Sequence, residues 1–261
     1  MGQQEELLRR GREALEVGEL KEAVRHFAEA AKQAPESVEI LLLWAEALGE
    51  KGDLRASTEL LRRAKELEPQ NIEVLYALGD VLLEGLQAEA ALKNYQEVVA
   101  LNADEGDAWV SMGLVHFQQE RFDKAEECYR RALKGDPENV FALNSLGDVA
   151  FSRGERDEAL TLFRRVVELE PEDPQGYYNL AELYYDLGDL AEAESECRKV
   201  VALDPSFSFA YLTLGNLCLD QEKGREALHF FEEFLLHERS ASAKEIRDEV
   251  KAVVEGLKAE L

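Results

Sequence analysis

Apolar and small residues recur along the chain at the spacing of helical faces. Within residues 142–151 one stripe repeats at i, i+3, i+4 and i+7, the spacing of a face that packs against a neighbouring element: Leu143, Leu146, Gly147 and Ala150. A second stripe of different chemistry runs along the same segment and consists of Asn144, Asp148 and Phe151. Because one buried stripe is enough to hold a helix in place, the second stripe is a candidate binding surface.

The helical pattern has a period of 34 residues. Five prolines share this phase, with one skipped near Ala103: Pro35, Pro69, Pro137, Pro171 and Pro205. Counting from Gln4 gives seven repeats without an insertion: 4–37, 38–71, 72–105, 106–139, 140–173, 174–207 and 208–241. Each repeat is expected to form two helices of roughly a dozen residues. A polar turn should join them near Gly18, Gly52, Gly154 and Gly188.

Three positions of every repeat are restricted in size. The eighth position is small throughout: Gly11, Ala45, Gly79, Gly113, Gly147, Ala181 and Gly215. The twentieth is small as well: Ala23, Ser57, Ala91, Ala125, Ala159, Ala193 and Ala227. The twenty-fourth is large and apolar, or is cysteine: Phe27, Leu61, Tyr95, Tyr129, Phe163, Cys197 and Phe231. We expect the small residues to let the paired helices cross closely, with the large residue filling the space beside the crossing.

Helix ends are marked by proline and by capping residues. Proline at the thirty-second position should end the second helix, because it pushes the preceding residue out of the helical region. Polar residues then stand where the next helix needs an N-cap: Ser37, Asn71, Asn139 and Asp173. Repeats three and seven have Ala103 and Arg239 where the pattern has proline, and repeat three has Leu86 at its turn.

These constraints resemble the tetratricopeptide repeat family, whose pattern runs from an aromatic residue or leucine through Leu-Gly, Tyr and Ala to Phe or Tyr and a closing proline. Repeat four follows it with Trp109, Met112-Gly113, His116, Ala125, Tyr129 and Pro137. The resemblance covers residues 4–241. It implies an all-α fold, an α-solenoid in which helix-turn-helix repeats form a right-handed superhelix.

Residues 242–261 are expected to form a capping helix at the carboxyl end of the stack. Ser242 and Glu245 form a candidate capping box. One apolar stripe follows helical spacing: Ile246, Val250, Val253, Leu257 and Leu261. The alternative is a detachable helix that binds a partner.

The charge of the chain restricts its partners. Fifty-five acidic residues against 30 basic ones give a net charge of −25. Nucleic acids and anionic membranes both attract Lys and Arg, so neither is an expected partner. Basic proteins or peptides are favoured electrostatically, although the charge can equally serve only to keep a surface hydrated. No apolar stretch approaches the ~20 residues that span a bilayer. The absence of a signal-peptide core and three widely spaced cysteines lead us to expect a cytoplasmic protein.

No motif for catalysis stands out from the repeats. The four histidines have no metal-ligand spacing, and neither a phosphate-binding glycine loop nor a nucleophile elbow is present. We therefore expect no enzymatic activity, no cofactor and no bound metal.

The resemblance implies a binding groove lined by the first helix of each repeat, through positions 2, 5, 6, 9, 12 and 13. In repeats two to seven eleven of these thirty-six residues are acidic and none is Lys or Arg. Recognition of acidic chaperone tails, which needs basic residues in the groove, is not expected. The candidate partner-binding residues are Tyr76, Asp80, Phe117, Phe141, Asn144, Asp148, Phe151, Tyr178, Asn179, Glu182, Tyr185, Phe209 and Asn216.

The sequence thus predicts a non-enzymatic scaffold or adaptor that binds a basic, partly apolar protein segment, with acids attracting the segment and aromatic rings burying its side chains. Three alternatives stay open. The aromatic residues at position 12 can pack against the next repeat and leave little surface for a ligand. The chain can self-assemble as a structural scaffold, or it can be the regulatory subunit of an enzyme complex.

Overall fold

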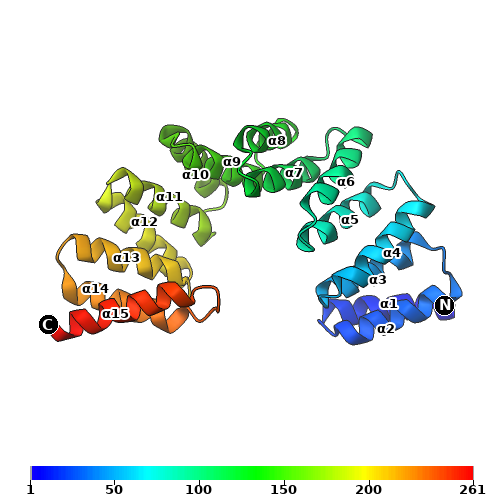
Figure 1. Ribbon diagram of the computed structural model, residues 1–261, viewed down its shortest axis with the longest axis horizontal. Coiled ribbons are helices and arrows are strands. Elements are labelled where there is room, and N and C mark those ends of the chain that lie inside the picture. The colour runs from blue at the N-terminus through cyan, green and yellow to red at the C-terminus, as the bar shows by residue number, and fades with distance from the viewer. Residues whose placement is uncertain (1, 261) are drawn as a thin grey trace. The chain divides into compact units, whose positions relative to one another are not determined.

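The computed structural model describes residues 2–260, which contain fifteen α-helices and no β-strand (Figure 1). The helices are α1 (Gln3–Glu16), α2 (Leu20–Gln33), α3 (Val38–Glu50), α4 (Leu54–Leu67), α5 (Ile72–Glu84), α6 (Ala88–Leu101), α7 (Gly106–Gln118), α8 (Phe122–Gly135), α9 (Val140–Ser152), α10 (Arg156–Leu169), α11 (Pro174–Leu187), α12 (Leu190–Leu203), α13 (Ser208–Asp220), α14 (Gly224–His237) and α15 (Lys244–Glu260). Leu261, predicted to extend the last apolar stripe, lies outside the described residues.

The chain divides into two compact units. The N-terminal unit is Met1–Pro137 and contains α1–α8, and the C-terminal unit is Glu138–Leu261 and contains α9–α15. Within each unit the helices pack as consecutive pairs, and the second helix of a pair packs on the first helix of the next (Figure 1). First helices of neighbouring repeats also touch, as α3 touches both α1 and α5. The predicted all-α solenoid of helical repeats is confirmed.

The crossing of the paired helices depends on a contact between the eighth and twenty-fourth positions of the repeat. A Cβ atom built on Gly79 would lie 2.4 Å from the Tyr95 ring, and one on Gly147 would lie 2.5 Å from the Phe163 ring. Both distances are too short for carbon atoms, so glycine is required where the partner is aromatic. Alanine replaces glycine in the two repeats whose partner is smaller, Leu61 or Cys197. The two positions therefore vary together because they share one volume.

The turn inside each repeat needs a left-handed residue. Gly18, Gly52, Gly154 and Gly188 have φ between 76° and 84°. The other three repeats place Leu86, Glu120 and Glu222 at φ of 57–59°. Such a backbone costs a residue with a side chain about 1–2 kcal/mol, so these three turns are strained.

Proline is not needed to end the second helix. Helices α6 and α14, which lack the proline, end two residues before its position, as the others do. In repeat four the Trp109 indole donates a hydrogen bond of 2.9 Å to the carbonyl of Ala103, the residue that replaces proline. Tyr177 and Tyr211 make the same contact with Pro171 and Pro205. An aromatic donor thus fastens the connection between these repeats whether or not proline is present.

Three of the four predicted N-caps are confirmed. Side chains of Asn71, Asn139 and Asp173 accept hydrogen bonds from backbone N–H groups of the helices they precede. Ser37 lies at the N-cap of α3 but makes no such bond. Residue type alone therefore predicted the position of this cap but not its hydrogen bond.

The last helix packs on the helix before it. Val250 and Val254 are buried in a cluster with Phe231 and Phe234 of α14, and Lys258 pairs with Glu232 at 2.6 Å. The predicted capping box of Ser242 and Glu245 is wrong. The helix begins at Lys244, and the Ser240 hydroxyl instead accepts from the Ala243 N–H at 3.2 Å and from Ser242 at 3.1 Å.

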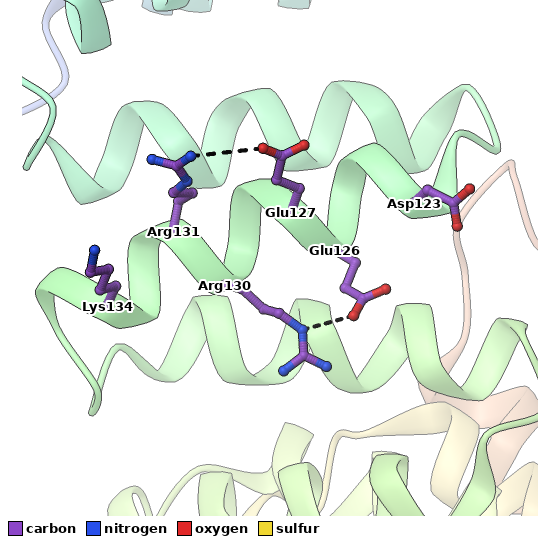
Figure 2. A pocket seen from close by; sticks show the side chains of 6 residues that line it. All are labelled: Asp123, Glu126, Glu127, Arg130, Arg131 and Lys134. Atoms are coloured by element: carbon purple, nitrogen blue, oxygen red, sulfur yellow. Dashed lines mark hydrogen bonds and ion pairs between the residues drawn. The ribbon is translucent and has the colours of Figure 1, made fainter.

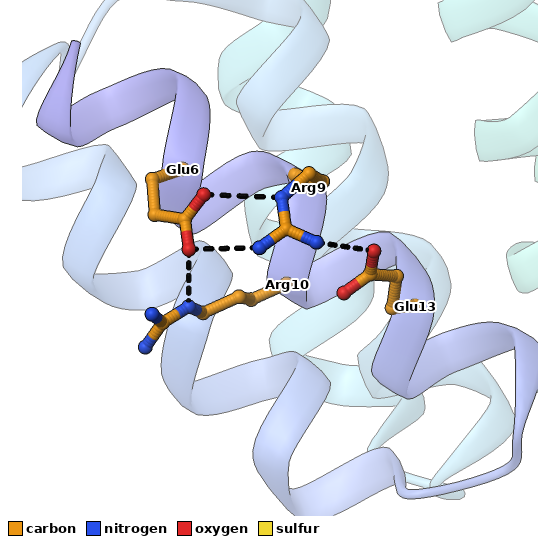
Figure 3. Close-up of polar contacts among 4 residues, drawn as sticks. All are labelled: Glu6, Arg9, Arg10 and Glu13. Atoms are coloured by element: carbon orange, nitrogen blue, oxygen red, sulfur yellow. Dashed lines mark hydrogen bonds and ion pairs between the residues drawn. The ribbon is translucent and has the colours of Figure 1, made fainter. Parts of the chain in front are cut away.

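The first helix carries an ionic cluster. Glu6 accepts hydrogen bonds from Arg9 and Arg10, and Arg9 also contacts Glu13 (Figure 3). The two arginines lower the pKa of Glu6 to about 2. Arg9 and Arg10 are therefore already paired with acids of the same helix.

Candidate functional site

A groove of about 1040 Å³ opens in the N-terminal unit along α3, α5 and the start of α7. Its apolar lining comes from both helices of repeat two and the first helix of repeat three, and includes Leu42, Leu43, Leu61, Ile72 and Val81. Leu61 and Val81 are buried, and the other three are half-buried. The groove therefore has an apolar floor large enough to cover several side chains of a ligand.

Charged residues around this groove are almost all acidic. Nine carboxylates line it: Glu39, Glu46, Glu50, Glu68, Glu73, Asp80, Glu84, Glu105 and Asp107. The one basic lining residue is Arg12, whose guanidinium lies 2.6 Å from the carboxylate of Glu39. We call this site the acidic groove. Its charge favours a cationic ligand.

Five carboxylates of the acidic groove have no hydrogen bond or ion pair within residues 2–260: Glu46, Glu50, Glu73, Glu84 and Asp107. Burial raises the pKa of Glu46, and repulsion from Glu50 and Glu73 raises it further. Burial also raises the pKa of Asp80. The repulsion acting on Glu46 indicates that no base within residues 2–260 neutralises the neighbouring carboxylates of Glu50 and Glu73. A bound cation would relieve this repulsion.

Tyr76 and Asp80, both predicted from the sequence, lie in the acidic groove. The Tyr76 hydroxyl lies 3.0 Å from the Ser111 hydroxyl of the next repeat, and its ring packs 5.6 Å from the Tyr95 ring. Tyr95 donates a hydrogen bond of 2.6 Å to Asp80. The groove wall is thereby joined to the packed centre of repeat three.

The structure places Phe117 away from this groove. Its ring meets the edge of Phe122 of the same repeat at 5.6 Å, and it is not among the groove-lining residues. Sequence analysis missed three charged lining residues: Arg12, Glu68 and Glu105. It left out repeat one and considered only first-helix positions, whereas Glu68 and Glu105 belong to the connections before α5 and α7.

In the C-terminal unit a chain of hydrogen bonds joins two predicted asparagines and an aspartate. Gln175 donates to Asn179 at 2.8 Å, Asn179 donates to Asn144 at 2.6 Å, and Asn144 donates to Asp148 at 3.4 Å. Burial raises the pKa of Asp148 to about 6, with a further contribution from the charge of Glu182. The side-chain N–H groups of these amides therefore donate to one another and to Asp148.

The other predicted residues of the C-terminal unit are distributed between internal contacts and solvent. Tyr178 donates to Glu182 and Tyr185 donates to Asp220, both at 3.0 Å. Phe151 is half-buried against its neighbours, and Phe209 meets Phe234 at 6.0 Å. Phe141 is 56% exposed. Asn216 is half-buried and has no side-chain hydrogen bond within the described range.

A smaller hollow of about 480 Å³ on α8 has balanced charge. Three acidic and three basic residues line it (Figure 2): Asp123, Glu126, Glu127, Arg130, Arg131 and Lys134. Arg130 pairs with Glu126 at 2.7 Å, and Arg131 lies 4.0 Å from Glu127. Because its charges pair on the same helix, this hollow has no net charge to attract a ligand.

The three cysteines and one histidine, His116, are buried. Cys128, Cys197 and Cys218 are buried free cysteines, and burial raises the pKa of each thiol. His116 is buried with its Nδ1 atom unpaired. Among residues 2–260, no three His, Cys, Asp or Glu side chains are grouped as a metal site, and no helix is long and apolar enough to cross a membrane.

Comparisons with known proteins agree on one family. Two models of the tetratricopeptide repeat match the chain, one over residues 76–140 and 144–206 and the other over residues 14–81. None of the curated proteins compared with the chain matches it.

Solved structures of repeat proteins share the fold. A tetratricopeptide repeat protein from Parabacteroides merdae ATCC 43184 is 22% identical, with a TM-score of 0.76 over 97% of this chain and 100% of that one. A segment of MamA from Desulfovibrio magneticus RS-1 is 28% identical, with a TM-score of 0.59 over 66% of this chain and 97% of that one. YrrB, a TPR protein with an unusual peptide-binding site, is 21% identical, with a TM-score of 0.55 over 70% of this chain and 95% of that one.

Proposed function

The chain belongs to the tetratricopeptide repeat family, whose repeats generally mediate protein–protein interaction, and we propose that it is a non-enzymatic scaffold whose acidic groove binds a basic, partly apolar segment of a partner protein. The observation that carries the proposal is the lining of the groove. Nine carboxylates and one arginine surround an apolar floor.

Charge and apolar contact have separate roles in this binding. The five unpaired carboxylates attract Lys and Arg side chains and speed encounter with the ligand. Exposed ion pairs contribute only about 0–1 kcal/mol each, so they do not supply most of the affinity. Apolar side chains of the ligand supply the rest by covering Leu42, Leu43 and Tyr76, at about 25 cal/mol per Å² of apolar surface removed from water.

Selection from a random library of twelve-residue peptides tests the proposal. We expect the full chain to select peptides that combine Lys or Arg with apolar residues. The triple variant Glu46→Lys, Glu73→Lys, Glu84→Lys should lose them. The matched control is Glu172→Lys, Glu192→Lys, Glu249→Lys, which changes the net charge equally at exposed acids of the C-terminal unit. The proposal fails if both triple variants bind the selected peptides equally well.

That the predicted residues of the C-terminal unit contact a partner is still a prediction. The alternatives of self-assembly and of a regulatory subunit stay open. Electrostatic attraction to a basic ligand is the feature that singles out the acidic groove.

A further inference from the structure

A second hollow of the N-terminal unit lies between α4 and the turn that joins α5 to α6. Its volume is about 430 Å³. Side chains along α4 form one wall and the turn forms the other, with these residues among the lining: Leu54, Thr58, Arg62, Gly85 and Gln87. Of all the residues that line this hollow, only Val81 also lines the acidic groove. The hollow is therefore a largely distinct surface of the same unit.

Leu86 lies between the lining residues Gly85 and Gln87, and neither its backbone conformation nor its exposed side chain stabilises the fold. Its side chain is 93% exposed, and its backbone has φ of 58°. Four repeats place glycine at the corresponding turn position. The leucine thus carries backbone strain and exposed apolar surface together, and burial inside the chain offsets neither. Glu120 and Glu222 have the same backbone strain at their turns, so the exposed apolar side chain is the feature that is particular to Leu86.

Arg62, on the α4 wall of the hollow, has an uncompensated charge. It is exposed and forms no ion pair within residues 2–260, whereas Arg55, about two turns earlier on α4, lies 3.6 Å from Glu59. The other two charged lining residues, Arg55 and Glu59, pair with each other, so Arg62 leaves the hollow with one positive charge in a chain of net charge −25. A free guanidinium can receive a carboxylate through two parallel hydrogen bonds.

We propose that the hollow is a docking site for an acidic segment of a partner protein that carries an apolar side chain next to its carboxylates. Arg62 binds a carboxylate of this segment, and Leu86 covers its apolar side chain. The ligand is opposite in charge to the ligand of the acidic groove. The N-terminal unit accordingly holds two partners of different chemistry on two surfaces, and the second site does not depend on the first.

The same peptide library tests this site on the full chain. We expect a second class of selected peptides, rich in Asp or Glu with a large apolar residue. Arg62→Glu and Leu86→Gly should each weaken their binding about tenfold or more, the loss typical of a central contact. Leu86→Gly should at the same time raise the melting temperature, because glycine relieves the left-handed turn. Higher stability with weaker binding separates docking from a folding defect.

Matched controls come from neighbouring positions. Glu120→Gly relieves a turn with φ of 57° in the next repeat, and it should raise the melting temperature without changing peptide affinity. Arg63→Glu reverses a charge that does not line the hollow, and it should leave affinity within about twofold. The groove variant Glu46→Lys, Glu73→Lys, Glu84→Lys should keep the acidic peptides, so failure of one site is distinguishable from failure of the other.

Three results would overturn the docking site. The first is a selection that yields no acidic peptides, and the second is equal binding of these peptides by wild type and Leu86→Gly. The third is a concentration-dependent dimer, measured by light scattering, that both Arg62→Glu and Leu86→Gly abolish. That dimer would make a second copy of this chain the occupant and not a partner protein.

Discussion

The acidic groove of the N-terminal unit and the corresponding face of the C-terminal unit use the same positions of the repeat but differ in where their carboxylates find partners. In the groove, Glu46 and Glu84 at positions 9 and 13 have no hydrogen bond within the described residues. In the C-terminal unit, Glu182 and Asp220 at the same positions accept hydrogen bonds from Tyr178 and Tyr185. Acids at the same two positions of the repeat are therefore unpaired in one unit and hydrogen-bonded in the other.

The helix crossings are the feature that both units share, and disrupting one should have the largest effect on stability. We expect Gly147→Leu to destabilise the protein by about 1–3 kcal/mol, because its first side-chain carbon already overlaps the Phe163 ring. Thermal unfolding followed by circular dichroism measures the loss. Gly256→Ala is the control, since nothing lies within 4 Å of its Cβ position. An unchanged melting temperature for Gly147→Leu would contradict the shared-volume explanation.

Neutralising Asp148 should stabilise the C-terminal unit in a pH-dependent way. Its pKa is about 6 in the folded protein, against a reference of 3.8, so the folded state binds this proton more tightly than the unfolded state. The charged carboxylate therefore costs stability as pH rises from about 4 to about 6, and the full cost remains above that range. Asp148→Asn should gain about 1–3 kcal/mol at pH 8 and little at pH 4.

Urea unfolding of both proteins at the two pH values measures this difference. Glu84→Gln in the acidic groove is the control, and we expect it to change stability by less than about 0.5 kcal/mol, as is usual for exposed positions. A gain for Asp148→Asn that is the same at pH 4 and pH 8 would show that proton binding is not its cause.

The connections between repeats offer a smaller test. Trp109 fastens a connection that has Ala103 where most repeats have proline, whereas Tyr177 fastens one that keeps Pro171. Trp109→Phe and Tyr177→Phe each remove one hydrogen bond, worth about 0.5–1.5 kcal/mol. We expect the loss to be greater for Trp109→Phe, because proline still restricts the other connection. Equal losses in urea unfolding would contradict this role for proline.

The sequence was sufficient for the architecture because each repeat carries its own constraints. The period of 34 residues, the small eighth position and the large twenty-fourth predicted the helix pairs and their crossing. The shared volume was visible in principle, since Ala45 and Ala181 accompany Leu61 and Cys197. Helix ends were less predictable: Ser37 and Ser242 have capping residue types, but their hydroxyl groups do not make the expected bonds.

The candidate site was only partly predictable, because hydrogen-bond partners come from distant positions. Tyr185 and Asp220 are 35 residues apart, as are Asn144 and Asn179. A count of acidic residues cannot show which carboxylates such contacts occupy. Likewise the rule that placed the groove in first helices omitted Glu68 and Glu105, which enter it from the connections. The repeat pattern identified the helix face that carries the acids, and the hydrogen-bond distances in the structure identified which carboxylates are unpaired.

The exposed ring of Phe141 tests whether the face of the C-terminal unit contributes to the proposed binding. Because the side chain is 56% exposed, Phe141→Ala should change stability by less than about 0.5 kcal/mol. We also expect the basic peptides selected through the acidic groove to bind this variant as they bind wild type. Fluorescence anisotropy with one labelled peptide measures both affinities, and Tyr76→Ala, which removes a ring from the groove, is the positive control. A loss of peptide affinity for Phe141→Ala equal to that for Tyr76→Ala would mean that the ligand also contacts the C-terminal unit. Unpaired carboxylates would then no longer distinguish the residues that bind the ligand from those that only stabilise the fold.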